Sequence, residues 1–328
     1  MKLSLSDFAA KLRTAAATEN AQFCIVYHIN PDGDCIGSAY ALMLILRALG
    51  AKCAVCGRDP VPANFRNMTD AVSSDRLDGN VQYIGVDCKD RSRTGSALQD
   101  KPYTFWIDHH GSPEEEAAYE YTVPAYSACA ELVLALAAEM AVPLTKQTAN
   151  LLYTALLTDT LCFRTVSTNA ATFEAAAQLA RAGADIYRIG RKYAMIKSQS
   201  RLRLEQIVYA GMHLLCDGQL VSGLITQQDM QDAGIAESNG PDMQNINSLL
   251  EAVASAKITL MIREYPPDNP EGHTRFMLKT LVPEISAREI AVRFGGGGHV
   301  QAAGGFMNES PQRTREILEE VCTQYLQK

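Results

Sequence analysis

Histidines and aspartates gather at four places along the chain, in combinations that suit metal chemistry. The first is HINPDGDCIGS, residues 28–38, which holds His28, Asp32 and Asp34 directly after the apolar run FCIVY. Carboxylates and imidazoles of this kind bind divalent cations or transfer protons. The remaining candidates end the later segments VQYIGVD, YTFWIDHH and LLYTALLTDT: Asp87, Asp108, His109, His110 and Asp159.

Taken singly, each cluster has a structural explanation, because PDGD forms a good turn and a lone helical aspartate is often a cap. Carboxylates brought together would repel one another and raise their pKa values unless cations lay between them. Two divalent ions supply that charge, and oxygen-rich ligand sets with few imidazoles favour manganese or magnesium over zinc. We therefore expect two Mn²⁺ ions, with Mg²⁺ or Co²⁺ as substitutes.

Two other interpretations of the first cluster fail on single residues. A calcium-binding EF-hand loop needs glycine at its sixth position and glutamate at its twelfth, where this chain has Cys35 and Ala41. No glycine-rich dinucleotide fingerprint follows the first strand, so a dehydrogenase is not expected.

The elements that must position these residues alternate between strands and helices. QFCIVYH, KCAVCG, VQYIGVD and YTFWIDHH read as strands, and helical patterns cover residues 127–140, 145–160 and 169–183. This order predicts an α/β domain with a largely parallel sheet flanked by helices. In such sheets ligands gather at the carboxyl ends of the strands, where the four clusters lie.

A chain of 328 residues is long for one core, so we expect two domains. The boundaries predicted are residues 1–185 for the domain with the metal site, 186–209 for a helical linker and 210–328 for a smaller α/β domain. We expect the active-site cleft between the two domains. Residues 188–203 hold six basic side chains and no acidic one, which fits a solvated linker helix or a basic wall of the cleft.

The composition and net charge of the chain limit the kinds of partner that we expect. A net charge of −7 argues against a broad groove for long duplex nucleic acid. No apolar run reaches the roughly 18 residues that span a bilayer, and nine scattered cysteines suit a reducing cytoplasm. We expect a cytoplasmic protein without membrane contact. Apolar helices around 127–160 pack within the domain or between copies, so a homodimer is left open.

The stretch GGGGHVQAAGG, residues 295–305, is compositionally unusual. It is either a flexible helix exit or an anion clamp, because glycine backbones approach a ligand closely and direct several N–H groups at it. The clamp would consist of Gly296, Gly297, Gly298 and His299.

In their order and spacing, the motifs HxxPDGDxxGS, Asp87, DHH (108–110), TDT around Asp159 and GGGGHVQAAGG resemble the DHH phosphoesterase family with its associated C-terminal domain. The resemblance implies that His28, Asp32 and Asp87 hold one metal. It implies a second metal on Asp34, Asp87, His109 and Asp159, with Asp87 as the bridge. In the catalytic roles it implies, Asp108 orients a ligand histidine and His110 faces the substrate phosphate.

The resemblance also implies a function. Size and arrangement are most like stand-alone bacterial members that degrade short oligoribonucleotides to mononucleotides and dephosphorylate 3′-phosphoadenosine-5′-phosphate (pAp) to AMP, using water activated by two metals. Short RNA or small phosphorylated nucleotides are thus the expected partners. The competing functions are a cyclic or linear dinucleotide phosphodiesterase, a single-strand DNA exonuclease, a pyrophosphatase, and an inactive nucleotide-binding regulator.

The chain departs from the family pattern at one substrate contact. Members of the family usually carry an arginine in the strand before the glycine loop, where TRFMLKT here offers Lys279, with Arg275 as the alternative. A lysine meets phosphate as a point charge and lacks the planar, two-pronged contact of arginine.

Overall fold

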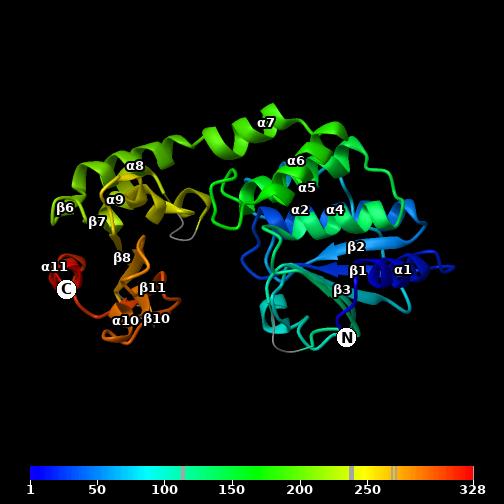
Figure 1. The fold of residues 1–328 in the computed structure, drawn as a ribbon, viewed down its shortest axis with the longest axis horizontal. Helices are drawn as coiled ribbons and strands as arrows, with labels where there is room; N and C mark the ends of the chain where they lie inside the picture. The colour runs from blue at the N-terminus through cyan, green and yellow to red at the C-terminus, as the bar shows by residue number, and fades with distance from the viewer. Residues whose placement is uncertain (112–114, 236–239, 267–268, 270–271, 328) are drawn as a thin grey trace. The chain divides into compact units, whose positions relative to one another are not determined.

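The computed structural model describes residues 1–111, 115–235, 240–266, 269 and 272–327. They divide into two compact units, Met1–Ile196 and Lys197–Lys328. Each unit has an α/β fold with its own sheet (Figure 1). The predicted fold class of two α/β domains, the first with a parallel sheet, is confirmed.

A five-stranded, wholly parallel sheet forms the centre of the first unit, in the order β2-β1-β3-β4-β5. All residues of β1 are buried, as expected for an inner strand of a parallel sheet. The chain order reverses beside β1 and β3, the kind of position where open α/β sheets bind ligands. The strands are β1 (Gln22–Val26), β2 (Lys52–Cys56), β3 (Gln82–Val86), β4 (Tyr103–Asp108) and β5 (Tyr119–Thr122).

Helices cover one face of this sheet and build the main core. Side chains of α1, α2, α4 and α5 pack there with alternate residues of the strands, among them Phe23, Ile25 and Phe105. The opposite face carries a smaller cluster around Trp106, covered by irregular segments and the short 3₁₀ helix η1 (Arg91–Thr94). The helices of the unit are α1 (Leu5–Ala16), α2 (Gly33–Ala48), α3 (Arg66–Thr69), α4 (Cys129–Glu139), α5 (Lys146–Asp159), α6 (Ala170–Arg181), α7 (Ile186–Gly190) and the π-helical turn η2 (Arg191–Met195).

Two glycines four residues apart let α2 and α5 approach closely. A Cβ atom at Gly33 would lie 2.2 Å from Oγ1 of Thr158, and one at Gly37 would lie 2.6 Å from the carbonyl oxygen of Leu151. Any side chain at either position would push the two helices apart. Because Asp34 lies in the first turn of α2 and Asp159 is the last residue of α5, this close packing sets the distance between two of the predicted metal ligands.

The second unit is a six-stranded mixed sheet in the order β10-β11-β9-β8-β7-β6. Only β7 and β8 pair in parallel. Helices α10 and α11 cover one face, and α8, α9 and η4 cover the other. The elements are α8 (Gln199–Gly211), β6 (His213–Leu215), β7 (Leu220–Ile225), α9 (Gln227–Ala233), η3 (Pro241–Met243), η4 (Ile246–Ala252), β8 (Ile258–Glu264), β9 (Thr274–Thr280), α10 (Ala287–Val292), β10 (Gly297–Gly298), β11 (Ala302–Met307) and α11 (Pro311–Leu326).

The predicted linker, residues 186–209, is divided between the units instead of standing apart from them. Ile189 of α7 is buried in the core of the first unit, whereas Leu204 and Val208 of α8 are buried in that of the second. The boundary lies after Ile196 because these apolar side chains belong to different cores.

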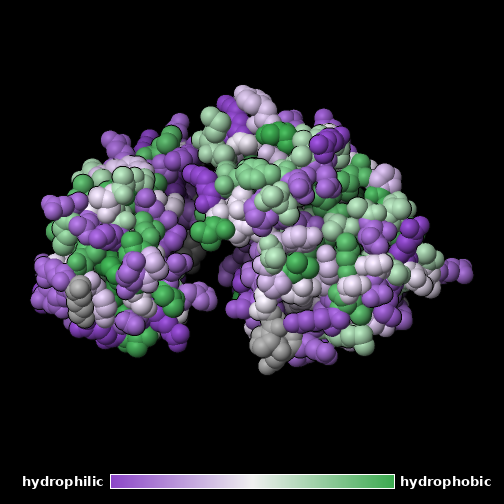
Figure 2. All heavy atoms as spheres, viewed as in Figure 1, coloured by the Kyte–Doolittle hydropathy of each residue, from purple (hydrophilic) through white to green (hydrophobic). Residues whose placement is uncertain are grey.

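The surface of each unit mixes polar and apolar side chains. On the face shown in Figure 2, hydrophilic and hydrophobic residues alternate over both units. Among the described residues, no helix has the length and apolar character needed to cross a membrane.

Candidate metal centre

His28 leaves the end of β1 with its ring held in one orientation. Its Nδ1 donates to the carbonyl of Ile29 at 2.8 Å, which leaves Nε2 free to act as a ligand. That nitrogen lies 3.6 Å from Oδ2 of Asp32 and 3.8 Å from Oδ2 of Asp87. The side chain is nearly buried, so it faces the cluster and not solvent.

The two aspartates of the first motif have different tasks. Asp32 is the N-cap of α2, where Oδ1 accepts from the backbone N–H groups of Asp34 and Cys35, both at 3.1 Å. Its other oxygen faces His28. Asp34, in the first turn, accepts from the N–H groups of Cys129 at 2.6 Å and Ala130 at 3.1 Å, so it caps α4 from another helix.

Asp87 stands at the centre of the cluster. It follows β3 in the left-handed region, with φ of 59°, and is 2% exposed. Oδ1 lies 3.4 Å from His109 Nε2 and 3.5 Å from His110 Nδ1, but among the described residues it accepts no hydrogen bond of good geometry. A buried carboxylate oxygen in this state fits a metal bridge, because such groups are otherwise costly.

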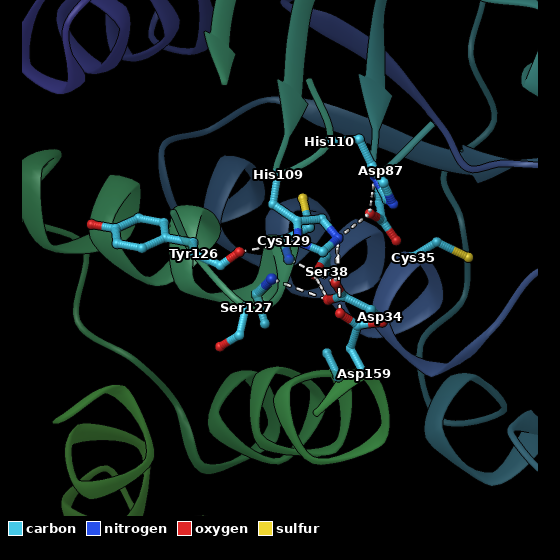
Figure 3. Close-up of polar contacts among 12 residues, drawn as sticks. Asp34, Cys35, Ser38, Asp87, His109, His110, Tyr126, Ser127, Cys129 and Asp159 are labelled. Atoms are coloured by element: carbon cyan, nitrogen blue, oxygen red, sulfur yellow. Dashed lines mark hydrogen bonds and ion pairs between the residues drawn. The ribbon is translucent and has the colours of Figure 1, made fainter. Parts of the chain in front are cut away.

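His109 connects Asp87 to the helical ligands, as Figure 3 shows. Its Nδ1 donates to the carbonyl of Tyr126 at 3.2 Å, which directs Nε2 into the cluster. That nitrogen lies 3.8 Å from Oδ2 of Asp159 and 4.0 Å from Oδ2 of Asp34. The structure thus brings together all six predicted ligands, from β1, α2, β3, β4 and α5.

The shifted pKa values show that the cluster carries too much negative charge. Burial, followed by the charge of Asp34, raises the pKa of Asp87 well above its usual range, and the same causes raise the pKa of Asp159 to about 7. Burial favours neutral His109, but its contact with Asp87 and the charge of Asp34 outweigh this and raise its pKa to about 10. Divalent cations would replace the protons that such a site retains.

The donor set fits the expected metals. It offers four carboxylates and two imidazoles, and the donor atoms of Asp34, His109 and Asp159 lie within 4.8 Å of one another. Cys35 is also near His28 and Asp32, but burial and the charges of Asp32 and Asp87 raise the pKa of its thiol far above the usual range. A thiol that stays protonated is a poor nucleophile and a poor metal ligand. The remaining donors are carboxylates and imidazoles, so hard, oxygen-preferring ions suit the site best.

Asp108 contacts a different histidine from the one expected. Its Oδ1 accepts from the backbone N–H of His110 at 2.7 Å and lies 2.8 Å from His110 Nδ1. Its Oδ2 accepts from the Lys89 backbone N–H, and Trp106 Nε1 lies 3.4 Å away. Asp108 therefore orients His110, the residue expected to face substrate; among the described residues no hydrogen bond or ion pair joins its side chain to the ring of His28 or His109.

One residue beside the cluster carries no sequence signal. A guanidinium nitrogen of Arg93, from η1, lies 3.3 Å from His28 Nδ1. No spacing rule marks an arginine in a 3₁₀ turn. The capping role of Asp34 has only an indirect sequence signal. Ala128, the residue before α4, has no side chain able to cap that helix, so the cap must come from another segment.

The glycine stretch of the second unit is a hairpin and not a loose helix exit. Gly297 and Gly298 form β10, which pairs with Gly304 and Ala303 of β11. The turn closes through the His299 N–H, which donates to the Ala302 carbonyl at 2.8 Å.

Glycine is required at two points of this hairpin. Gly298 has φ of 141°, in the region that favours glycine, and a Cβ at Gly296 would lie 2.4 Å from the carbonyl oxygen of Gly304.

Strand register distinguishes the two basic candidates on β9. Lys279 pairs with Ala302, next to the turn that carries His299, whereas Arg275 pairs with Phe306 at the other end of β11. The guanidinium of Arg275 lies over the Phe306 ring, 5.8 Å from its centroid. Lys279 is therefore the cation beside the glycine hairpin, where it forms an ion pair with Glu251 at 2.7 Å.

The six basic residues of segment 188–203 are divided between the two units. Lys197 and Arg201 pair with Glu205 in the second unit, at 2.6 and 2.7 Å. Arg188 and Lys192 line a cavity of the first unit.

Comparisons with known proteins agree with the resemblance seen in the sequence. Residues 22–156 match the DHH family, N-terminal domain. The chain is 27% identical over 304 residues to "Bifunctional oligoribonuclease and PAP phosphatase NrnA" of Thermus thermophilus, covering 90% of this chain and 88% of the relative. It is also 27% identical over 261 residues to "Probable manganese-dependent inorganic pyrophosphatase" of Streptococcus thermophilus, covering 74% and 83% of the two chains.

A solved structure has the same fold over nearly the whole chain. The exopolyphosphatase-related protein of Bacteroides fragilis matches with a TM-score of 0.82 and 22% identity, covering 98% of this chain and 96% of that one. The predicted resemblance to the DHH family is confirmed, with residues 22–156 matching its N-terminal domain.

Charge repulsion in the cluster predicts that the substitution Asp159→Asn changes the stability of the metal-free protein. The raised pKa of Asp159 means that its ionised form destabilises the metal-free fold, with the full effect above about pH 7 and less at lower pH. In chelator at pH 8 we expect the variant to be more stable than the parent by at least about 1 kcal/mol, and by less at pH 5.

Thermal melting measures this difference, with Asp100→Asn, an exposed aspartate outside the cluster, as control. In Mn²⁺ at pH 8 the order should reverse, because the variant lacks a ligand. An Asp159→Asn variant less stable than the parent in chelator at pH 8 would contradict the account.

Proposed function

We propose that this protein, whose residues 22–156 match the DHH family, is a hydrolase of phosphoester bonds. It would degrade short oligoribonucleotides to mononucleotides and convert pAp to AMP. The observation that carries this proposal is the gathering of five other potential ligands beside the buried carboxylate of Asp87, whose Oδ1 accepts no hydrogen bond of good geometry among the described residues. A buried carboxylate oxygen without a hydrogen bond is uncommon in a purely structural cluster, because leaving such a group unpaired is costly. The similarity to an oligoribonuclease and PAP phosphatase over most of both chains supports the substrate class.

We assign the ligands to two ions. His28, Asp32 and Asp87 would hold one, and Asp34, Asp87, His109 and Asp159 the other. When bound, two Mn²⁺ ions supply Lewis-acid chemistry: they ease the loss of a proton from water and neutralise phosphate oxygens. The carbonyls of Ile29 and Tyr126 keep the two imidazoles aimed at the site.

His110 is the residue proposed to contact the substrate phosphate. Asp108 fixes its Nδ1, so Nε2 is left for a phosphate oxygen, and the side chain is 38% exposed. Asp108 is buried and also accepts hydrogen bonds from the Lys89 backbone N–H and the Trp106 indole N–H. These bonds keep its carboxylate from turning toward solvent, so it holds the His110 ring in place. His110 can then stabilise negative charge that develops on the phosphate.

The glycine hairpin of the second unit is proposed to bind the remainder of a short nucleotide. Gly297 and Gly298 have no side chains that would keep a ligand away from the backbone, and the side chain of the next residue, His299, can donate to an anion. Gly296 contributes by its lack of a side chain, because its own N–H donates to the Ala291 carbonyl at 3.0 Å. Lys279 adds a positive charge beside them, for which Glu251 is the resting partner. Arg275 is a weaker candidate because of its distance from the turn in the sheet register.

Pyrophosphate hydrolysis is the second candidate, because a relative of similar identity bears the name of a manganese-dependent pyrophosphatase. The two activities would use the same metal ligands and differ in what the second unit must bind. A nucleotide-binding regulator without turnover would be expected to lack a metal ligand, and this chain has all six.

Product analysis tests the proposal. Purified protein with Mn²⁺ is given a diribonucleotide, pAp or pyrophosphate, with a chelator control. We expect mononucleotides and AMP, and we expect Asp87→Asn to lower turnover by roughly 100-fold or more while Asp100→Asn has no effect. Turnover of pyrophosphate alone would reject the proposed substrates, and an active Asp87→Asn variant would reject the metal assignment.

Lys279→Ala tests the part given to the second unit. Loss of one charged contact to substrate should raise KM for pAp about tenfold and leave kcat nearly unchanged, because the contact is equal in ground and transition states. Arg313→Ala, which removes an exposed ion pair on α11, is the matched control. Equal KM values for both variants and the parent would remove Lys279 from the binding site.

A further inference from the structure

The first unit contains a cavity of about 520 Å³ that the proposed reaction does not use. Its walls come from α3, the first half of α5 and the segment that ends in the π-helical turn η2; Figure 1 shows α5 and α7 as neighbours. This volume is typical of sites for small molecules. The lining residues are Asn67, Met68, Ala71, Lys146, Gln147, Asn150, Leu151, Thr154, Asp185, Arg188, Ile189, Lys192 and Tyr193.

Positive charge predominates in this cavity, although the whole chain carries −7. Lys146, Arg188 and Lys192 line it against one carboxylate, Asp185. Asp185 is already engaged, because it caps α7 by accepting from the Arg188 backbone N–H at 3.0 Å. Three cations, one from the start of α5 and two from the adjoining turns α7 and η2, therefore line one space with little compensation.

The cations lack ion-pair partners in the part of the chain that the structure describes. No ion pair joins Lys146, Arg188 or Lys192 to a carboxylate there. Lys192 donates to the side-chain oxygen of Asn67 and lies 4.9 Å from the centroid of the Tyr193 ring. Burial and the charge of Arg188 lower the pKa of Lys192, as expected where like charges are held together.

The cavity also has apolar and aromatic lining residues. Leu151 and Ile189 are buried, and Met68 lies beside them. The ring of Tyr193 stacks on Phe65 at 5.5 Å between centroids, with 19° between the planes. The amides of Gln147 and Asn150 add neutral polar groups. The cavity therefore offers a ligand both cations and apolar surface.

We propose that this cavity binds a small organic phosphomonoester, with the phosphate on Arg188, Lys192 and Lys146 and the apolar body against Met68, Leu151 and Tyr193. Arginine and lysine together are the usual partners of phosphate. The π-helical turn that presents Lys192 and Tyr193 is a rare conformation, frequent at functional sites.

The proposed site is separate from the metal centre but shares a helix with it. None of the six metal ligands lines the cavity. The lining residues of α5 end at Thr154, and Asp159 follows five residues later, about 7.5 Å along the helix axis. A phosphomonoester that reaches the metal centre would thus occupy a different set of residues.

Hydrogen exchange with mass spectrometry on the Mn²⁺-loaded full chain tests the proposal. The probes are AMP and inorganic phosphate at equal millimolar concentrations. We expect AMP to protect peptides covering residues 146–151 and 188–193, with the Kd for this protection at least tenfold weaker in the double variant Arg188→Ala, Lys192→Ala. Phosphate should protect them less than AMP, because it lacks an apolar body.

The control is Arg191→Ala, an exposed basic residue of the same turn that does not line the cavity. It should bind AMP as the parent does, and all three proteins should melt at the same temperature and keep the same basal turnover. No protection of these peptides by saturating AMP, or equal protection in the double variant, would overturn the proposal. Equal protection by phosphate and AMP would reject the apolar part of the site.

Discussion

Mutual repulsion among buried carboxylates is the constraint on which the rest of the first unit depends. Asp34, Asp87 and Asp159 lie around one histidine nitrogen, and burial makes each ionised form costly. Protein atoms alone do not relieve this, because one oxygen of Asp87 accepts no hydrogen bond of good geometry among the described residues. Divalent cations would convert the same repulsion into strong binding, since each carboxylate then faces positive charge.

The fold holds these groups together against that repulsion. Parallel strands deliver His28, Asp87 and His109 to one edge of the sheet, and each histidine is fixed by a backbone carbonyl. The helical ligands depend on close packing, because Gly33 and Gly37 let α2 lie against α5. Asp34 also caps α4, whose N-terminal N–H groups stabilise its negative charge.

Sequence patterns predict the features that depend on the order of residues within one short segment of the chain. Inner strands such as β1 and β3 read as continuous apolar runs, and polar residues at their carboxyl ends must meet at one edge, so the ligand cluster could be predicted. Contacts made by distant segments could not. The short edge strand β5 (Tyr119–Thr122) has little apolar signal, Gly33 reads only as a turn residue, and Arg93 comes from a 3₁₀ turn. The hairpin at Gly297 and Gly298 depends on pairing with β11, which composition does not encode.

The central claim is that the carboxylate of Asp87 bridges two divalent ions. Anomalous diffraction from crystals grown with Mn²⁺, recorded at the manganese absorption edge, tests it most directly. We expect two peaks, one on each side of Asp87 and roughly 3.5–4 Å apart, one near His28 and the other near His109. A single peak, or peaks that do not contact Asp87, would contradict it.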